Sequence, residues 1–472
     1  MVSMSSESLL KAQEKMRAAG VHNIAIDAFT RFYSIVEAGD DSYIHESDIE
    51  PLTDVSFMDE VLAQYANEEP GSHSGSGALS RTAMLKLNGG LGTSMGLQQA
   101  KSLLEVRDGK TFLDFIVDQV LWARETHQVQ LPLMFLNSFR TESDTLAALS
   151  KYPTLPVEGL PLSLLQNQEP KISEETLEPV NFAQDPELEW CPPGHGDVYT
   201  VLATSGVLTQ LIEQGFQYLN ISNVDNLGAA PSAEIAQWFE ESGAPFAAET
   251  VRRTPADRKG GAVVVRDGQL ILRETAQITE EDAAAASNIS KHKYFNANTL
   301  WIRISALLEL LEKHHGFLPL PLIQNHKTVD PTDPTTERVI QLESAMGAAI
   351  ELFEGARALV IDRSRFLPVK TTNDLLLLRS DVYEVDDSFK LNAVHDEPLI
   401  TLDPEFFGII ADFEERFENG IPSLAHADSL TVEGPWRFGA DIEVLGDASL
   451  VSNDGAERYV EDGQVLDTNY EA

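Results

Sequence analysis

The glycine-rich segment from Lys86 to Gly96, KLNGGLGTSMG, constrains the fold of this chain more than any other feature. An apolar stretch that we predict to be a strand, residues 83–87, runs directly into four glycines, at positions 89, 90, 92 and 96. Glycines let the backbone turn sharply and let its N–H groups approach a phosphate without interference from a Cβ atom. A helix expected to follow would add its positive N-terminus. The pattern favours a phosphate-binding loop over a merely tight turn.

Two familiar phosphate loops do not fit this segment. A P-loop ending in Lys101-Ser102 requires glycine where this chain has Met95 and Ala100. A dinucleotide-binding fingerprint requires two residues between its second and third glycines, whereas three residues separate Gly92 from Gly96. Lys101 is interpreted as a phosphate contact rather than as an ordinary exposed lysine. The loop therefore predicts a nucleotide site of another type.

The charge balance limits the classes of partner. The chain has 34 basic and 75 acidic residues, a net charge of −41. Such a surface repels nucleic acid, whose binding requires lysine and arginine to neutralise phosphates. An anionic substrate must therefore be held by local backbone N–H groups, a few lysines and a divalent cation. We expect small-molecule partners and no nucleic acid.

The chain shows no sign of a membrane or secreted protein. No stretch approaches the roughly 18 consecutive apolar residues of a membrane helix, and the first residues do not resemble a signal peptide. The only cysteine, Cys191, allows no intrachain disulfide and is interpreted as a small apolar filler rather than a reactive thiol. A cytoplasmic location is expected.

Short apolar runs alternate with helical patterns through the middle of the chain. This alternation predicts an α/β fold with a largely parallel sheet and helices on both faces, with ligands beyond the carboxyl ends of the strands. The predicted strands are residues 83–87, 131–136, 218–222, 262–265, 299–302 and 359–362, and the predicted helices are 112–125, 197–214, 233–242 and 304–314. We divide the chain into an N-terminal helical segment and linker (1–80), a catalytic domain (81–385) and a β-rich C-terminal domain (386–472), which is a candidate β-helix entered by a helix over 405–418.

Two further segments carry polar residues suited to a site. In CPPGHGD, prolines and glycines stiffen a loop that presents His195 for a substrate contact, and Asp197 is a structural helix N-cap. In SNVDNLG, an apolar strand ends in Asn223 and Asp225, which alternate onto the same side. One carboxylate at a strand end is the minimal anchor for Mg²⁺, with substrate phosphates and water as the other ligands. Asx-turn chemistry at the start of a loop is the alternative for this segment.

Weaker candidates follow along the chain. A carboxylate and amides suit the hydroxyl groups of a neutral sugar, and such groups occur with Gly260 and at Glu274, Asn296 and Asn298. Lys370 follows a predicted strand and is a candidate second phosphate clamp.

Several of these motifs together resemble the eukaryotic-type UTP–glucose-1-phosphate uridylyltransferase (UDP-glucose pyrophosphorylase) family. The resemblance covers residues 80–385 and rests on KLNGGLGTSMG, PLMFLNSF, CPPGHGDVY, SNVDNLGA, ADRKGG, RETAQI, FNANTLWI, VIQLESAMGAAI and RSRFLPVKTTNDLLLLRSDVY, in that order. It implies a nucleotide-diphospho-sugar transferase core, which is a Rossmann-like mixed sheet, followed by a left-handed β-helix. It also implies an enzyme that makes UDP-glucose and pyrophosphate from UTP and glucose 1-phosphate.

The resemblance assigns roles to individual residues. It implies that the uracil is held by Leu87, Asn88, Gly89, Gly90, Gln166 and Gly194. His195 and Asn223 would face glucose 1-phosphate, while Gly260, Glu274 and an asparagine of the FNAN segment, Asn296 or Asn298, would contact the glucose hydroxyls. Asp225 would bind Mg²⁺, and Lys101 and Lys370 would neutralise the phosphates as the catalytic residues.

The chain departs from the family pattern in a few places. Gln99-Ala100 replaces the common Gly-Pro, and Cys191 replaces a tyrosine. Leu91 and Ser94 stand where the related UDP-N-acetylhexosamine group tends to have glutamine and arginine, which favours the glucose branch. Two alternatives stay open at this point: a broader UDP-sugar pyrophosphorylase that also accepts galactose 1-phosphate, and a catalytically silent sugar-nucleotide sensor or scaffold. Strand edges in the C-terminal domain would allow a homo-oligomer.

Overall fold

The computed structural model describes residues 7–40, 42–66, 76–92, 95–97, 99–254, 260–452 and 454–468. Its centre is an eight-stranded sheet in the order β2-β18-β12-β15-β11-β3-β6-β7. Neighbouring strands are parallel except at β15, which runs antiparallel to both β11 and β12. The strands are β2 (Ser56–Phe57), β3 (Thr82–Asn88), β6 (Leu133–Asn137), β7 (Ser163–Leu165), β11 (Tyr218–Asn223), β12 (Phe246–Arg252), β15 (Tyr294–Arg303) and β18 (Arg357–Ile361). The predicted α/β fold with a largely parallel sheet is confirmed.

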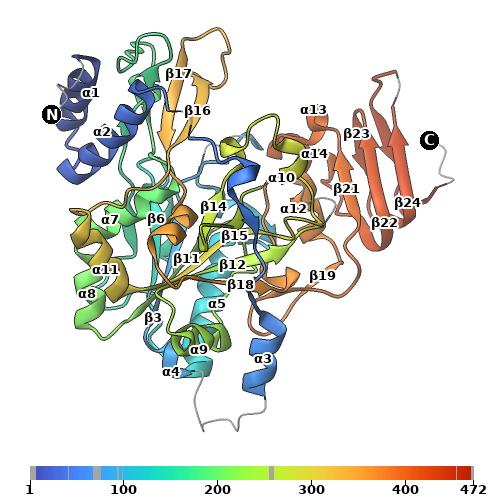
Figure 1. Ribbon diagram of the computed structural model, residues 1–472. Helices are drawn as coiled ribbons and strands as arrows, with labels where there is room; N and C mark the ends of the chain where they lie inside the picture. The colour runs from blue at the N-terminus through green and yellow to red at the C-terminus, as the bar shows by residue number, and fades with distance from the viewer. Residues whose placement is uncertain are drawn as a thin grey trace.

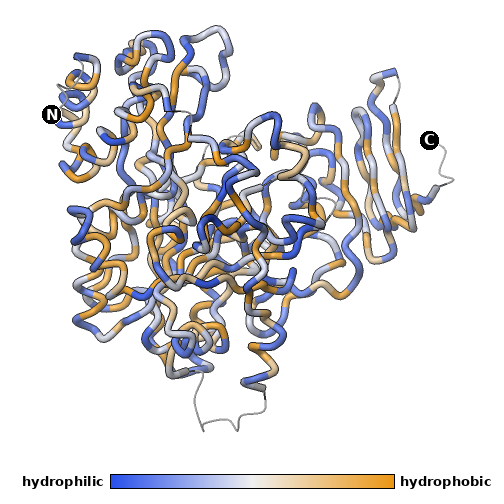
Figure 2. Tube along the Cα trace, viewed as in Figure 1, coloured by the Kyte–Doolittle hydropathy of each residue, from blue (hydrophilic) through white to orange (hydrophobic). Residues whose placement is uncertain are grey.

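The sheet buries both faces under helices because its strands alternate between two apolar cores. Met84 of β3 joins one core with α5 and α9, whereas Ala83 and Leu85 join the other core with α7, α8 and α11. Figure 1 shows these helices around the central strands, and in Figure 2 hydrophobic stretches run through the same strands. The helices are α5 (Phe112–His127), α7 (Val198–Thr204), α8 (Val207–Glu213), α9 (Ala233–Ser242) and α11 (Ile304–Lys313).

Two helix predictions within residues 81–385 are wrong in detail. The predicted helix 197–214 is divided into α7 and α8 because Gly206 adopts φ 77°, a left-handed conformation that ends a helical ladder. The helix expected after the glycine loop is also missing from the described residues there: Lys101–Leu103 form a single 3₁₀ turn (η3), and α5 begins only at Phe112. The start of α5 is fixed by a capping box between Thr111 and Asp114.

The N-terminal segment contributes strands as well as helices. Helices α1 (Glu7–Ala18) and α2 (Asn23–Glu37) pack against apolar residues of a small sheet that contains β9, β16 and β17. Strand β2 lies at the edge of the central sheet, and β1 extends the hairpin of β13 and β14. The sequence patterns predicted only helices here, because two-residue strands carry no periodicity of their own. The elements are β1 (Glu50–Pro51), β9 (Ile172–Ser173), β13 (Ala262–Arg266), β14 (Gln269–Arg273), β16 (Ile323–Thr328), β17 (Arg338–Glu343), α3 (Met58–Ala66) and α4 (Ser76–Leu79).

The C-terminal residues form stacked parallel strands, drawn at the right of Figure 1. Strands β21, β22, β24 and β26 pair in parallel in chain order, and β23 pairs in parallel with β25. The predicted helix 405–418 is two short helices, α13 and α14, that meet at Gly408. The bounds are α13 (Pro404–Phe407), α14 (Ile410–Arg416), β21 (Leu399–Leu402), β22 (Ser423–Glu433), β23 (Trp436–Phe438), β24 (Glu443–Val451), β25 (Arg458–Val460) and β26 (Val465–Leu466).

Short elements complete the fold. They are β4 (Glu105–Arg107), β5 (Lys110–Thr111), β8 (Glu169–Pro170), β10 (Trp190–Cys191), β19 (Tyr383–Val385), β20 (Leu391–Ala393), α6 (Glu142–Leu149), α10 (Ala283–Ala286) and α12 (Thr372–Arg379). Within the described ranges, no helix has the length and apolar character needed to cross a membrane. Cys191 is buried, and burial raises the pKa of its thiol, which fits the interpretation of an apolar filler.

Candidate active site

The predicted site residues gather at one edge of the central sheet. The glycine loop follows β3, Asn223 and Asp225 lie at and just beyond the end of β11, and Lys370 follows β18. Because β3, β11, β12 and β18 share one direction, their carboxyl ends open on the same edge. The antiparallel strand β15 begins at this edge and brings Asn296 and Asn298 to it.

Three of the residues assigned to the uracil lie in direct contact. Gln166 Nε2 donates to the carbonyl oxygen of Gly194 at 2.7 Å. A methyl group placed on Gly89 would lie only 2.7 Å from Gln166 Oε1, so a side chain at position 89 would displace the amide of Gln166. The structure therefore joins the end of β3, the residue after β7 and the CPPGHGD loop into one surface.

The loop after β3 is held in shape by its own protein contacts. The carbonyl oxygen of Leu87 accepts from Val224 N, that of Gly89 from Ser138 Oγ, and that of Gly90 from Lys101 N. The side chain of Asn88 is buried, with Nδ2 donating to Asn137 and Thr145. The carbonyl oxygen of Asn88 also has a protein partner, because it accepts from Thr141 Oγ1 at 2.7 Å. Thr93 and Ser94 lie outside the described residues.

His195 is a neutral imidazole with a defined tautomer. Its Nδ1 accepts from the backbone N–H of Met346 at 3.0 Å, and desolvation lowers the pKa of His195 to about 4. At neutral pH Nε2 therefore carries the proton and acts as a donor. The loop that presents His195 is closely packed: Gly194 and Gly196 lie against Ser344, whose backbone oxygen would lie 2.6 Å from a Cβ on Gly194.

Asp197 has a role that the sequence did not predict. It precedes α7 as expected, but its side chain makes no capping bond. Its carboxylate instead accepts from both the backbone N–H of Asn167, at 2.7 Å, and Asn167 Nδ2, at 2.8 Å. Burial raises the pKa of Asp197 to about 6, against the opposing effect of these two bonds. The carboxylate thus fixes the residue that follows Gln166 in the chain.

Charged groups meet between the loop and β11. Lys101 Nζ donates to Asp225 Oδ2 at 2.7 Å and also to the carbonyl oxygen of Val369. Val369 N in turn donates to the backbone oxygen of Asp225 at 3.1 Å. The next residue, Lys370, is exposed, and its charge acts on Glu274, where it opposes the increase in pKa that burial causes.

An Mg²⁺ ion at Asp225 would need substrate phosphates and water for most of its ligands. Among the described residues, no group of three or more histidine, cysteine, aspartate or glutamate side chains is arranged to hold a metal ion. Asp225 offers one carboxylate at the open edge of the sheet, next to a lysine. Mg²⁺ binds in this way when substrate phosphates and water supply most of its ligands.

Amide and carboxylate groups form a third cluster, at the start of β15. Asn298 Nδ2 donates to Asn223 Oδ1 at 2.9 Å. This contact depends on a bulge, because the register between β12 and β15 shifts after Glu249 and leaves Ala297 and Asn298 without partners on β12. Asn298 has φ 55° there, which asparagine tolerates better than most residues. The bulge turns Asn298 towards the end of β11.

Glu274 closes the same cluster from the end of β14. A Cβ on Gly261 would lie 2.5 Å from Glu274 Oε2, so the carboxylate rests directly on the glycine backbone. Gly260 O accepts from Arg253 Nη2 at 2.9 Å, and Gly261 O accepts from Asn296 N at 2.9 Å. Lys259 lies outside the described residues.

The segment 344–347 contacts both the CPPGHGD loop and the start of β15. Ser344 packs on Gly194, Met346 N holds His195, and the backbone of Gly347 contacts Asn296 Nδ2, with 3.0 Å to an added Cβ. In the sequence this segment is marked only by its place in the motif VIQLESAMGAAI. Gly194 and Gly196 did signal that some backbone approaches closely, but the neighbour is more than 140 residues away in the chain and has no local pattern.

Comparison with known proteins places this geometry in a family. The sequence model of the family described as UTP–glucose-1-phosphate uridylyltransferase matches residues 26–444. A protein of that name from Saccharomyces cerevisiae is 40% identical over 393 residues, covering 82% of this chain and 77% of its own. Another, from Musa acuminata, is 36% identical over 475 residues and covers 98% of both chains.

Solved structures agree over nearly the whole length. The UDP-glucose phosphorylase of Trypanosoma brucei superposes with a TM-score of 0.90 at 41% identity, covering 98% of this chain and 99% of its own. A mutant UDP-glucose pyrophosphorylase from Leishmania major, in complex with UDP-glucose, gives a TM-score of 0.90 at 40% identity and covers 99% of both chains. The resemblance predicted from the motifs is confirmed, and the chain belongs to the UTP–glucose-1-phosphate uridylyltransferase family.

Proposed function

We propose that this chain converts UTP and glucose 1-phosphate reversibly into UDP-glucose and pyrophosphate. The observation that carries the proposal is the contact of Lys101 with Asp225. On one side of it lies the surface made by Gln166 and the glycine backbone, and on the other lies the cluster of Asn223, Asn298 and Glu274. The first surface suits a uracil, the second suits sugar hydroxyls, and the charged pair lies where phosphates would meet. The Leishmania major relative holds UDP-glucose.

The reaction is an in-line transfer at phosphorus. A phosphate oxygen of glucose 1-phosphate forms a bond to the α-phosphorus of UTP, and the bond between that phosphorus and the bridging oxygen of the pyrophosphate breaks. The nucleophile is already an anion, so no general base is required. Catalysis then consists of positioning and charge neutralisation. The neutral state of His195 agrees with a binding role as a hydrogen-bond donor.

The residues of the site divide this work. Gln166 and the backbone at Gly89 and Gly194 orient the uracil. Lys101 and Lys370 neutralise the reacting phosphates and the pyrophosphate, and Asp225 would hold Mg²⁺. Bound there, Mg²⁺ would supply positive charge to phosphate oxygens of both reactants.

Removing the carboxylate at position 225 tests the metal role. We expect Asp225→Asn, which keeps the side-chain shape, to lower turnover by about 100-fold or more, a range typical of lost electrostatic stabilisation. Mg²⁺ titrations of turnover should require a higher concentration for half-maximal activity. An unchanged Mg²⁺ requirement would contradict the assignment.

A panel of sugar 1-phosphates tests the substrate. With UTP and Mg²⁺, we expect glucose 1-phosphate to give pyrophosphate and UDP-glucose in equal amounts, and to outcompete galactose 1-phosphate. Equal use of both sugars would favour the broader UDP-sugar pyrophosphorylase. UDP-glucose binding without any pyrophosphate release would favour the silent sensor or scaffold.

We also propose that the C-terminal residues form a left-handed β-helix and pair subunits. Parallel pairing of successive strands in chain order supports a coiled path. The last strand, β26, carries Val465, which is 43% exposed at the sheet edge. Sedimentation should show an oligomer that Val465→Lys dissociates, whereas a wild-type monomer would contradict the pairing.

The cytoplasmic location stays a prediction, which cell fractionation would test.

A further inference from the structure

A stretch of the N-terminal segment is bound to the hairpin that carries Glu274. Ile44 N donates to the carbonyl oxygen of Gln277 at 2.9 Å, and Glu50 and Pro51 pair with β13 as an additional antiparallel strand. Gln277 Oε1 accepts in turn from the backbone N–H of Glu274 at 2.9 Å. The chain from residue 44 to residue 51 is therefore part of the scaffold of the sugar cluster.

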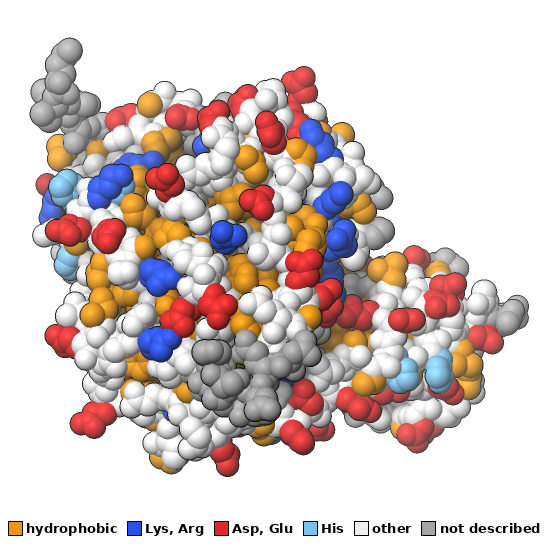
Figure 3. All heavy atoms as spheres, turned by 60° about the horizontal axis from the view of Figure 1, so that its bottom comes forward, with side chains coloured by type: hydrophobic (Ala, Val, Ile, Leu, Met, Phe, Trp, Pro, Cys, Tyr) orange, Lys and Arg blue, Asp and Glu red, His pale blue; other side chains and the backbone are white. Residues whose placement is uncertain are grey.

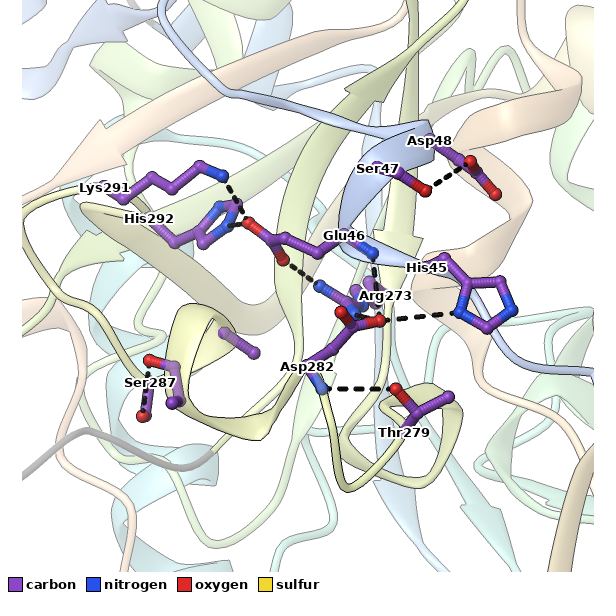
Figure 4. A network of polar contacts seen from close by, with 12 residues as sticks. His45, Glu46, Ser47, Asp48, Arg273, Thr279, Asp282, Ser287, Lys291 and His292 are labelled. Atoms are coloured by element: carbon purple, nitrogen blue, oxygen red, sulfur yellow. Dashed lines mark hydrogen bonds and ion pairs between the residues drawn. The ribbon is translucent and has the colours of Figure 1, made fainter.

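Glu46 is the charged centre of this contact. Figure 4 shows its carboxylate between Lys291 and His292 on one side and Arg273 on the other. Lys291 Nζ lies 2.6 Å from Glu46 Oε1, and His292 Nε2 lies 2.8 Å from the same oxygen. Burial opposes ionisation of Glu46, but hydrogen bonds from Lys291, His292 and Arg273 together lower its pKa to about 2. Glu46 is therefore ionised throughout the physiological range.

The partners of Glu46 are themselves enclosed. The side chain of Arg273 is 2% exposed and that of His292 is 3% exposed. Asp282 adds a second carboxylate, which accepts from Glu46 N at 3.0 Å and lies 3.4 Å from Arg273 Nη2. A buried guanidinium requires such partners, because without them its charge is left uncompensated.

The position of these partners in the chain links the network to the sugar cluster. Arg273 immediately precedes Glu274 at the end of β14. Lys291 and His292 precede β15, which begins at Tyr294 and carries Asn296. One carboxylate therefore ties together the two segments that present the groups assigned to the glucose hydroxyls, although Glu46 itself lies in the N-terminal segment.

We infer that Glu46 is a positioning residue for the sugar half of the site and sets affinity for the glucosyl group without touching it. The inference rests on the proposed function, because it takes Glu274 and Asn296 as the sugar contacts. It assigns residues 44–51, which lie outside the predicted catalytic domain, to substrate selection.

Binding of UDP-glucose and of UDP provides the test. UDP lacks the glucosyl group and carries an additional ionisable oxygen on its terminal phosphate, so each ligand is compared between the wild type and the variant at one pH. We expect Glu46→Gln to raise the Kd for UDP-glucose by about tenfold, the size of one lost charge-assisted hydrogen bond, and to leave the Kd for UDP within about twofold of the wild-type value. In steady-state assays KM for glucose 1-phosphate should rise while KM for UTP stays constant. Asp48→Asn is the matched control: it lies on the same 3₁₀ turn (Glu46–Asp48), its side chain contacts Ser47, and it should change neither constant.

The outcomes separate the inference from the function on which it rests. If Glu46→Gln weakens binding of UDP-glucose and of UDP equally, or changes neither Kd, the inference is overturned. The proposed function, and the inference with it, would be overturned if the wild-type protein forms no UDP-glucose and does not bind it more tightly than UDP. If Glu46→Gln does not fold, Lys291→Met removes a single donor from a partly exposed position, and it should weaken UDP-glucose binding in the same direction by a smaller factor.

Discussion

Asp197 is a buried carboxylate near Gln166 whose ionisation changes within the ordinary pH range. Its carboxylate accepts two hydrogen bonds from Asn167, and burial raises its pKa to about 6. Above that pH the group is ionised and accepts both bonds. Below it, a proton occupies an oxygen that faces a donor, so the support for the neighbouring Gln166 weakens.

We therefore expect UDP-glucose to bind more weakly as the pH falls from 7 to 5. The ligand itself carries no group that titrates in this range, so isothermal titration calorimetry reports on the protein. Asp197→Asn should bind UDP-glucose weakly at both pH values, because the substitution replaces one of the two carboxylate oxygens that accept from Asn167 with an amide donor. A wild-type Kd that stays constant over this range would contradict the role of Asp197.

For the individual site residues, the sequence predicted which ones lie close together but not the hydrogen bonds that fix their positions. Lys101 and Asp225 were proposed for adjacent tasks, and the structure joins them in an ion pair. Local patterns identified His195 but did not identify Met346, whose N–H fixes its tautomer. Such partners come from distant parts of the chain, and no spacing in the sequence encodes them.

The hairpin of β13 and β14 sets the position of Glu274 through Gly261. A methyl group at position 261 would lie 2.5 Å from Glu274 Oε2, and the carboxylate is the movable part of that contact. We expect Gly261→Ala to displace Glu274 and raise KM for glucose 1-phosphate by about tenfold, the equivalent of one lost hydrogen bond, with KM for UTP unchanged.

Gly268 gives the control for that substitution, because it lies at the turn of the same hairpin with open space around its Cα. Gly268→Asn keeps a residue that tolerates the left-handed conformation of the turn and should leave both KM values unchanged. An unaltered KM for glucose 1-phosphate in Gly261→Ala would remove Glu274 from the sugar site.

Helices and strands were predicted correctly where the apolar pattern was regular. Predictions failed where the backbone conformation of a single residue interrupted the element. Helix α9 was predicted with its observed bounds, Ala233–Ser242. The break at Gly206 and the bulge at Asn298 were missed, since each depends on one left-handed residue inside an otherwise regular pattern. That bulge places a predicted site residue, so the geometry of the sugar cluster could not be derived from propensity alone.

The molecule as a whole carries a strongly negative field. In Figure 3 acidic side chains are spread over the visible face rather than gathered in one patch, in keeping with the net charge of −41. UTP and glucose 1-phosphate are anions, so this field slows their approach. Salt shortens the range of the field from about 30 Å at 0.01 M to about 8 Å at 0.15 M.

We expect the rate constant for association of the protein with UTP, measured in the presence of Mg²⁺, to rise as the salt concentration increases from 0.01 M to about 0.15 M. Stopped-flow fluorescence at constant Mg²⁺ measures it, and the dissociation rate should change less. A falling association rate would mean that the lysines of the site dominate the field at the encounter distance, and would contradict a repulsive role for the surface.

Lys101 is proposed to stabilise the transferring phosphates rather than to bind the product. The most direct measurement compares turnover with UDP-glucose affinity in Lys101→Ala. We predict that kcat falls by about 100-fold or more, as for other lost electrostatic contacts in active sites, while the Kd for UDP-glucose stays within about threefold of the wild-type value. Near-wild-type turnover in this variant would contradict this role of Lys101.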